Sequence, residues 1–322
     1  MSIATKPTPP GAPVDRPLSV SDTDADRWTP LTDEERRQFH EEGYVVVRNA
    51  IDEDRRLAVE AIIDDFYEQE KAAGNLWKGD WMHLQGGVIR HPEFARLLDD
   101  NRAFRWIWGL LGWNIYSHHN HLDVNPPLDE TGEPERWGWH QDGWRQNSDA
   151  EYMGEYYGYD VSRPQFSIKT AFVFSDLSET DRGSTLIIPG SHLDNTLPRP
   201  DDPEDFEHPE GTIQVTGNPG DALVFDRRMW HSRSRNFSDI TRKIFFLGYT
   251  YRWIRPLDPM PLEYAEPFWD ELTDVQKQLL GDGPNLPDYW GIHEAGGIND
   301  AIPLRAELKE RGLLDRSVPW LR

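Results

Sequence analysis

After Gly112 the sequence breaks into short apolar or alternating segments separated by Gly, Pro and Asp. Regularly spaced segments of this kind are typical of antiparallel sandwiches and barrels, whose tight turns need such residues. With 25 Gly and 25 Pro among 322 residues, turn-rich β structure is favoured over a helical bundle. We predict strands over residues 114–125, 137–142, 165–175, 184–188, 212–216, 222–225, 229–233 and 242–254.

Helical signals come before and after this region. A capping signature at residues 31–35 opens a helix that leads to Gly43, and a buried strand follows at 44–47. The periodicity of residues 52–70 predicts an amphipathic helix, and a further helix is expected from Pro92 to Leu111. Two short helices are expected at residues 273–280 and 303–311.

We expect a single folded core with two additions. Residues 1–30 are rich in Pro, Asp, Ser and Thr, which predicts a disordered arm. Residues 31–255 form the predicted β domain with its N-terminal helices. Residues 256–322 are expected to be a C-terminal helical extension that packs on the core.

Composition excludes several classes of protein. There is no Cys, which removes disulfide scaffolds, thiolate metal sites and Cys nucleophiles. A formal charge of −23 argues against nucleic-acid or acidic-membrane binding, because phosphates would be repelled. No apolar run has the length of a membrane span and the N-terminus lacks a secretory h-region. We therefore expect a cytoplasmic protein, monomeric or homodimeric, with a small-molecule substrate.

The strongest chemical motif is Trp139-His140-Gln141-Asp142. Side chains two apart on a strand share a face, so His140 and Asp142 can bind one metal ion. A third ligand from a distant strand would give two imidazoles and one carboxylate on a single face. That arrangement suits non-haem Fe(II) oxygen chemistry.

Further motifs follow in order along the chain. They are Gly43-Tyr44-Val45-Val46, Asn125-Pro126-Pro127, Arg182-Gly183-Ser184, Pro189-Gly190-Ser191-His192, Gly220-Asp221, and His231 with Asn236, Ser238 and Arg242 behind it. Over about residues 31–253 this pattern resembles the phytanoyl-CoA dioxygenase-like family of Fe(II)- and 2-oxoglutarate-dependent oxygenases. The resemblance implies a mainly β fold with flanking helices around a double-stranded β-helix (jelly-roll, cupin-like) core.

The resemblance also implies the roles of individual residues. His140, Asp142 and His231 would be the iron ligands, and Arg242 would hold the distal carboxylate of 2-oxoglutarate. The cofactors would be Fe(II), 2-oxoglutarate as cosubstrate, and O₂. The family usually has a small hydroxyl residue two positions after the distal His, where this chain has Arg233. Around the cosubstrate we also place Arg233, Ser232, Asn125 and Gln141, and around the substrate His121, Trp144, Arg145 and Lys169.

The implied reaction is hydroxylation of an unactivated C–H bond of a small metabolite or natural-product intermediate, with succinate and CO₂ as co-products. Desaturation, cyclisation, epimerisation or carbonyl formation are alternative outcomes of the same chemistry. A carboxylate at position 142 argues against halogenation, because halogenating relatives carry a small residue there.

Two alternatives come from other classes of protein. One is a non-enzymatic cupin-like binding protein with a vestigial site. The other is a zinc hydrolase that uses His119 and His121, which alternate onto one face of a predicted strand with Asp123 after them.

Overall fold

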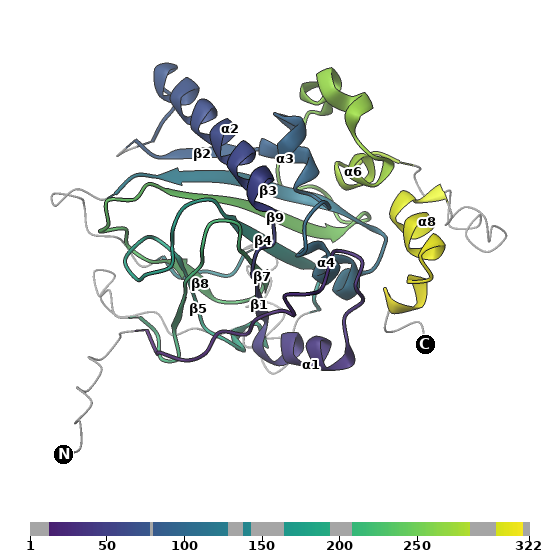
Figure 1. The fold of residues 1–322 in the computed structure, drawn as a ribbon, viewed down its shortest axis with the longest axis horizontal. Coiled ribbons are helices and arrows are strands. Elements are labelled where there is room, and N and C mark those ends of the chain that lie inside the picture. Colours follow the sequence, from purple (N-terminus) through teal and green to yellow (C-terminus); the bar gives the residue numbers. More distant parts are fainter. Residues whose placement is uncertain are drawn as a thin grey trace, which may run out of the picture.

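The computed structural model describes residues 13–77, 80–127, 138–142, 164–193, 208–283 and 301–317. Two antiparallel sheets form its centre (Figure 1). The larger, six-stranded sheet has the order β1-β7-β4-β9-β3-β2, and the smaller, three-stranded sheet has the order β6-β5-β8. The strands are β1 (Tyr44–Val47), β2 (Met82–Gln85), β3 (Ile115–Asn125), β4 (Ser167–Val173), β5 (Thr185–Ile187), β6 (Ile213–Val215), β7 (Ala222–Asp226), β8 (His231–Arg233) and β9 (Arg242–Tyr251).

The predicted jelly-roll class is confirmed, and most predicted strands coincide with observed ones. The segment predicted at 137–142 contributes an isolated bridge between His140 and His231. β2 was not predicted, because its four residues Met-His-Leu-Gln alternate over a short stretch only and include no β-branched or aromatic strand former.

Both faces of the large sheet are buried, and they have different partners. Leu122, Phe245 and Leu247 point to the helices and belong to the main apolar cluster. Ile244 and Phe246 point between the two sheets and belong to a second cluster. The strands therefore have an outer face that packs the helices and an inner face that lines the space between the sheets.

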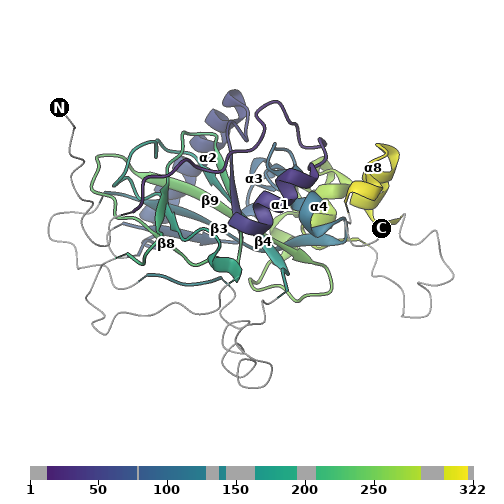
Figure 2. The same cartoon turned by 90° about the horizontal axis from the view of Figure 1, so that it is seen from below.

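The helices cover the outer face and one end of the large sheet (Figure 1). α1 and α4 lie side by side (Figures 1 and 2), with the ring centroids of Phe39 and Trp106 5.8 Å apart. Leu279 and Leu308, from the region after the β domain, belong to the same apolar cluster as the sheet. The α-helices are α1 (Asp33–Glu42), α2 (Glu53–Ala72), α3 (Pro92–Arg96), α4 (Phe104–Leu111), α6 (Asp274–Leu279) and α8 (Pro303–Glu310), and the short 3-10 helices are η1 (Gly87–Ile89), η2 (Ser191–Leu193), η3 (Leu262–Tyr264), η4 (Glu266–Glu271) and η6 (Leu314–Arg316).

The single helix expected from Pro92 to Leu111 is wrong, because the chain forms α3 and α4 with a turn between them. The turn contains Asp99, Asp100 and Asn101, whose short polar side chains compete with helical backbone hydrogen bonds. The amide of Asn101 donates to the Leu97 carbonyl at 2.7 Å. The carboxylate of Asp99 accepts a hydrogen bond from Gln276 of α6 at 2.8 Å.

Residues 13–30, expected to be disordered, instead lie against the folded core. Val20 forms a parallel bridge with Val46 of β1, and the Ser21 N–H donates to the Val46 carbonyl at 2.9 Å. β1 is an edge strand of the large sheet, so this segment covers backbone groups that would otherwise be open to another chain. Composition alone missed this, because the partners of the segment are distant along the chain: the backbone of β1, and Phe104 of α4, whose ring centroid lies 6.1 Å from that of Trp28.

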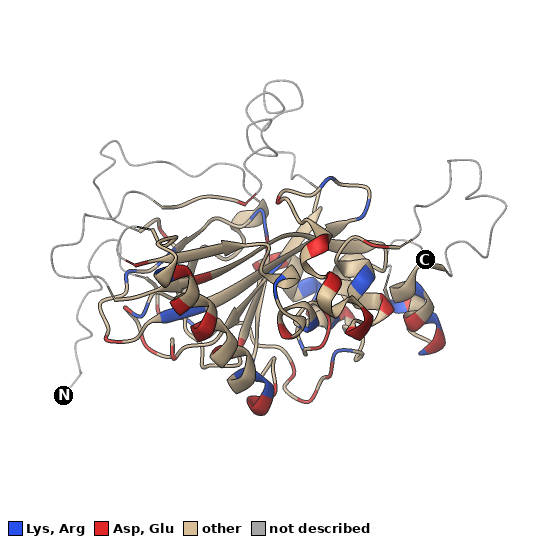
Figure 3. Ribbon diagram, turned by 90° about the horizontal axis from the view of Figure 1, so that it is seen from above, with Lys and Arg blue, Asp and Glu red and all other residues tan. Residues whose placement is uncertain are grey.

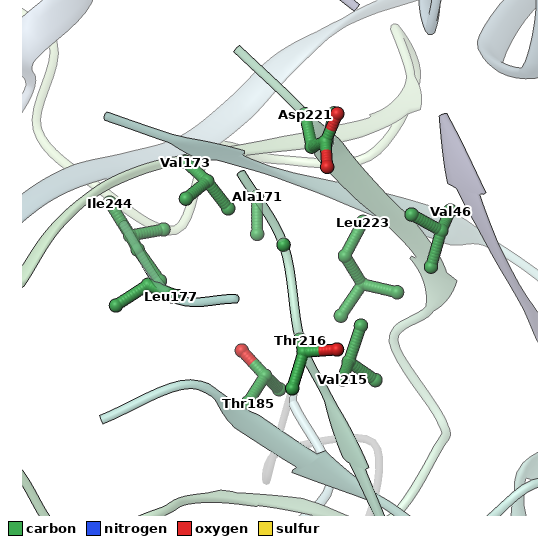
Figure 4. Close-up of a pocket in the computed structure, with 12 residues that line it drawn as sticks. Val46, Ala171, Val173, Leu177, Thr185, Val215, Thr216, Asp221, Leu223 and Ile244 are labelled. Carbon is green, nitrogen blue, oxygen red and sulfur yellow. The ribbon is translucent and has the colours of Figure 1, made fainter. Parts of the chain in front are cut away.

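One end of the space between the sheets is packed. A cavity of about 20 Å³, room for about one water, lies between inner-face residues such as Ala171, Val173 and Leu223 and the opposite sheet's Val215 (Figure 4). Asp221, at its edge, is 2.6 Å from Arg48. A cavity of this size leaves no room for a small molecule at this end of the space between the sheets.

In the described part of the chain, none of the helices combines the length and the apolar character that crossing a lipid bilayer requires.

Candidate metal and cosubstrate site

Three predicted ligands converge where the 138–142 segment meets β8. The Nε2 atom of His140 lies 3.9 Å from Asp142 Oδ1, and the Nε2 atom of His231 lies 3.8 Å from the same oxygen. The ligand atoms of the three residues all lie within 4.8 Å of one another. The spacing is that of three donors around one ion.

The backbone fixes both imidazoles with Nε2 facing inward. His140 Nδ1 lies 2.7 Å from the Gly138 carbonyl, and His231 Nδ1 lies 2.9 Å from the Met229 carbonyl. A carbonyl can only accept, so each Nδ1 carries the proton and each Nε2 presents a lone pair. This orientation by a backbone carbonyl is usual for metal-binding histidines.

Electrostatics favour the protonation states that a divalent metal needs. Burial lowers the pKa of His231 to about 3, which leaves its imidazole neutral. Burial alone would raise the pKa of Asp142, but Lys169 and Arg227 hold it well below its usual range. Two imidazoles and one ionised carboxylate on one face fit Fe(II).

The 138–142 segment is joined to the fold by several hydrogen bonds. His140 and His231 exchange two backbone hydrogen bonds at 3.0 Å each. The Asp142 N–H donates to the Arg227 carbonyl at 2.9 Å, and the buried Gln141 amide donates to the Arg228 carbonyl. Gln141, predicted beside the cosubstrate, thus helps to anchor the segment that carries two of the ligands.

The predicted cosubstrate arginine begins β9 on the inner face. The guanidinium of Arg242 is buried and donates to Asn125 Oδ1 at 2.6 Å, and it lies 3.8 Å from Asp123 Oδ2. A Cβ added at Gly183 would lie 2.8 Å from Arg242 Cδ, so the missing side chain makes room for the arginine stem. The structure therefore brings Arg242 and Asn125 together, as predicted.

Beside Arg242, a second His/Asp cluster lies on the inner faces of β2 and β3. His83 Nδ1 is 2.7 Å from Asp123 Oδ1, and His121 Nε2 is 3.7 Å from Asp123 Oδ2. The hydrogen bond that His83 donates to the Asp123 carboxylate raises the pKa of His83. His119 is occupied on both ring nitrogens, by Asp258 at 2.8 Å and by His121 Nδ1 at 3.2 Å. This argues against the His119–His121 zinc site, because neither nitrogen of His119 is left for a metal.

The remaining predicted residues lie in different surroundings. The guanidinium of Arg233 lies 4.2 Å over the ring of Trp81. Ser232 alternates with its neighbours on β8 and lies on the strand face opposite His231. Lys169 contacts Asp142, as described below. Trp144 and Arg145 lie outside the described residues.

Sequence reasoning missed two buried neighbours of the metal site. Arg227 Nε lies 3.3 Å from Asp142 Oδ2, and its NH1 atom lies 2.6 Å from His118 Nε2. His118 reaches the inner face because a β-bulge between Ser117 and His119 shifts the alternation of β3. No sequence signal marks such a bulge, so the strand pattern alone could not place His118.

A cleft of about 570 Å³ opens beyond the ends of β3 and β9. Its walls include Tyr116, Trp253, Arg255 and Met260. The ring of Tyr116 is 6.4 Å from that of His118, which contacts Arg227. Two side chains thus connect this cleft to the metal ligand Asp142.

The comparisons with known proteins agree with this geometry. The family model of phytanoyl-CoA dioxygenase (PhyH) matches residues 39–244, which is more than half of the chain and includes the ligands. The chain belongs to the phytanoyl-CoA dioxygenase family. It is an Fe(II)- and 2-oxoglutarate-dependent dioxygenase, with O₂ as the oxidant. An ectoine dioxygenase from Sphingopyxis alaskensis is 23% identical over 283 residues, covering 75% of this chain and 84% of that protein.

Solved structures support the fold. EctD from S. alaskensis, solved with 2-oxoglutarate and 5-hydroxyectoine, has a TM-score of 0.53 at 19% identity, covering 79% of this chain and 87% of that one. HygX from Streptomyces hygroscopicus, solved with nickel and 2-oxoglutarate, has a TM-score of 0.55 at 14% identity, covering 71% and 91%. At these identities the likeness establishes the shared jelly-roll fold.

Proposed function

We propose that this family member hydroxylates an unactivated C–H bond of a small polar metabolite or natural-product intermediate. In this assignment His140, Asp142 and His231 hold Fe(II), and Arg242 with Asn125 binds the distal carboxylate of 2-oxoglutarate. The convergence of both Nε2 atoms on one oxygen of Asp142 carries the assignment. When bound, iron and cosubstrate supply the oxidative decarboxylation that delivers one oxygen atom to the substrate.

The chain's own residues prepare this chemistry in three ways. Backbone carbonyls orient the two imidazoles. The buried guanidinium of Arg242 offers a charge-assisted, fork-shaped contact to a carboxylate. The apolar inner face around Phe246 and Ile244 keeps water away from the reacting centre.

The distribution of cations favours a small substrate over an acyl-CoA. Asp and Glu recur along the outer helices (Figure 3). Of the arginines that could have formed a phosphate-binding cluster, Arg227 and Arg228 are buried and bound to Asp142 and Asp226. Arg233 lies over Trp81 and Arg235 over Phe237. These four guanidiniums have separate partners rather than one shared site.

We also propose that the cleft beyond β3 and β9 admits the substrate. Its volume of about 570 Å³ lies within the usual range of small-molecule sites, and it combines aromatic walls with cationic groups. Trp253 is 67% exposed there, so its replacement by Ala should leave the fold intact. Trp253→Ala is expected to raise the KM for substrate and to leave the affinity for 2-oxoglutarate unchanged.

The decisive test begins with anaerobic reconstitution with Fe(II) and 2-oxoglutarate. We expect a visible metal-to-ligand charge-transfer band that is lost in His140→Ala and in Arg242→Ala. Candidate substrates are then screened by succinate release, and labelled O₂ should place one oxygen atom in succinate and one in the product. Well-folded, iron-loaded protein without the band would refute the assignment. A product without the label would point instead to desaturation or cyclisation.

A further inference from the structure

Lys169 is a buried cation on the inner face of β4. Its side chain is 5% exposed, and its strand neighbours are Phe225 on β7 and Gly248 on β9. The ammonium lies 4.7 Å from the centre of the Phe246 ring. A lysine in such surroundings is costly unless an anion compensates it. Its compensating anion is the metal ligand Asp142, whose Oδ2 lies 2.9 Å from Lys169 Nζ.

The two oxygens of Asp142 have separate partners. Oδ1 faces the Nε2 atoms of His140 and His231, at 3.9 and 3.8 Å. Oδ2 faces the cations, at 2.9 Å from Lys169 Nζ and 3.3 Å from Arg227 Nε. We propose that Lys169 is a positioning residue that occupies Oδ2, so that Asp142 binds the metal through Oδ1 alone.

This inference rests on the proposed iron site and explains a requirement of it. A free carboxylate can bind a metal through both oxygens, which would fill a position that cosubstrate or O₂ needs. With Oδ2 held by a donor, the carboxylate contributes one oxygen and the face opposite the three ligands stays open.

Lys169 also ties the ligand segment to the rigid sheet. The 138–142 segment joins β8 of the small sheet through the bridge between His140 and His231, whereas Lys169 belongs to a central strand of the large one. The contact between Lys169 and Asp142 therefore spans the space between the sheets. Arg227 adds a second donor from the end of β7, with its NH1 atom occupied by His118.

A positioning role and a merely structural one predict different results for Lys169→Met. Removing a positive charge near a divalent ion favours metal binding. We expect Co(II), used as the spectroscopic probe for Fe(II), to bind Lys169→Met no more weakly than wild type. Oδ2, left with only the longer contact to Arg227, would then turn to the metal, so the affinity of the Co(II) protein for 2-oxoglutarate is expected to fall about tenfold. A change in the Co(II) d–d bands before cosubstrate is added should report the extra ligand.

Two further variants control the test. Lys169→Gln keeps a hydrogen-bond donor for Oδ2 without the charge, so it should retain most of the affinity for 2-oxoglutarate. Lys243→Met makes the same chemical change on β9, at a lysine that binds Glu60 and Asp64, and should alter neither affinity. If Lys169→Met does not fold, the d–d spectrum of Lys169→Gln, expected to match wild type, still tests the proposal.

The results that overturn the proposal differ from those that overturn the iron site. If Lys169→Met loses Co(II) together with 2-oxoglutarate, or keeps the wild-type affinities and spectrum, Lys169 does not set the coordination of Asp142. The proposal is also refuted if the Co(II) d–d bands of Lys169→Gln change in the same way as those of Lys169→Met. In that case a hydrogen-bond donor at position 169 does not hold Oδ2. Failure of the wild-type Co(II) protein to bind 2-oxoglutarate would instead refute the proposed function.

Discussion

Gly183→Ala tests whether the side chain of Arg242, the first residue of β9, needs the space that the glycine leaves beside it. Gly183 has φ +79°, and an added Cβ would lie 2.8 Å from Arg242 Cδ and 3.4 Å from Asn236 Cβ. The left-handed backbone costs an L-residue about 1–2 kcal/mol. The contact with Arg242 is shorter than carbon atoms tolerate, so the stem must shift and carry the guanidinium with it.

The size of the effect follows from what the guanidinium binds. A hydrogen bond to a charged group contributes about 1.5–3 kcal/mol, so misplacing one contact to the cosubstrate carboxylate should weaken 2-oxoglutarate binding about 10- to 100-fold. The measurement is an anaerobic titration of the Fe(II) protein with 2-oxoglutarate, followed by the charge-transfer band. Thermal unfolding reports the backbone cost separately.

Gly74→Ala is the matched control. Gly74 has φ +73°, and no heavy atom lies within 4 Å of its added Cβ, so it carries the backbone cost without the contact. Gly183→Ala should lose more stability than Gly74→Ala, because it adds the contact to the backbone cost, and only Gly183→Ala should lose affinity for 2-oxoglutarate. Equal affinities in the two variants would show that Arg242 does not hold the cosubstrate, or that its stem adjusts freely.

Three further predictions concern stability. Arg105→Ala should lower the free energy of unfolding by about 3–5 kcal/mol in urea titrations, because it leaves the Glu35 carboxylate without its charged partner. The buried guanidinium donates to the two oxygens of Glu35 at 2.7 and 2.9 Å. Burial raises the pKa of Glu35, but hydrogen bonds from Arg105 and Thr32 bring it below its ordinary value. This carboxylate thus stabilises the fold above its unfolded-state pKa and loses that contribution as pH falls through its folded-state pKa. In Glu35→Gln, the free energy of unfolding should therefore depend less on pH over this acidic range. Thr32→Ala removes the capping box of α1 and should cost about 1 kcal/mol in the same urea assay. An unchanged urea midpoint in Arg105→Ala or Thr32→Ala would contradict the corresponding contact. So would an acid-unfolding curve of Glu35→Gln that matches wild type.

The sequence could predict what depends on local pattern. Alternation along the predicted strand at 242–254 puts Arg242, Ile244 and Phe246 on one side, and the structure has all three on the inner face. The spacing of His140 and Asp142 on a predicted strand put both on the same side of the chain. These are period-two effects, which a strand imposes wherever it lies in the fold.

What the sequence could not predict depends on packing between elements distant along the chain. The sequence places Lys169 beside the substrate, whereas in the structure it contacts Asp142 across the space between the sheets. No local signal in the sequence identifies that carboxylate as its partner. No sequence signal pairs His83 with Asp123, because only the fold brings β2 beside β3. The arm before residue 31 was missed because its partner is the backbone of β1.

The two-faced large sheet has a consequence for how such enzymes diversify. Along β3, residues 119, 121, 123 and 125 face the site, while Leu122 and Val124 pack the helical core. Inner-face positions of β3 can therefore change without disturbing the residues that pack the helical core. A library on β3 that holds Asp123 and Asn125, the partners of Arg242, constant would vary the site and leave both apolar clusters unchanged.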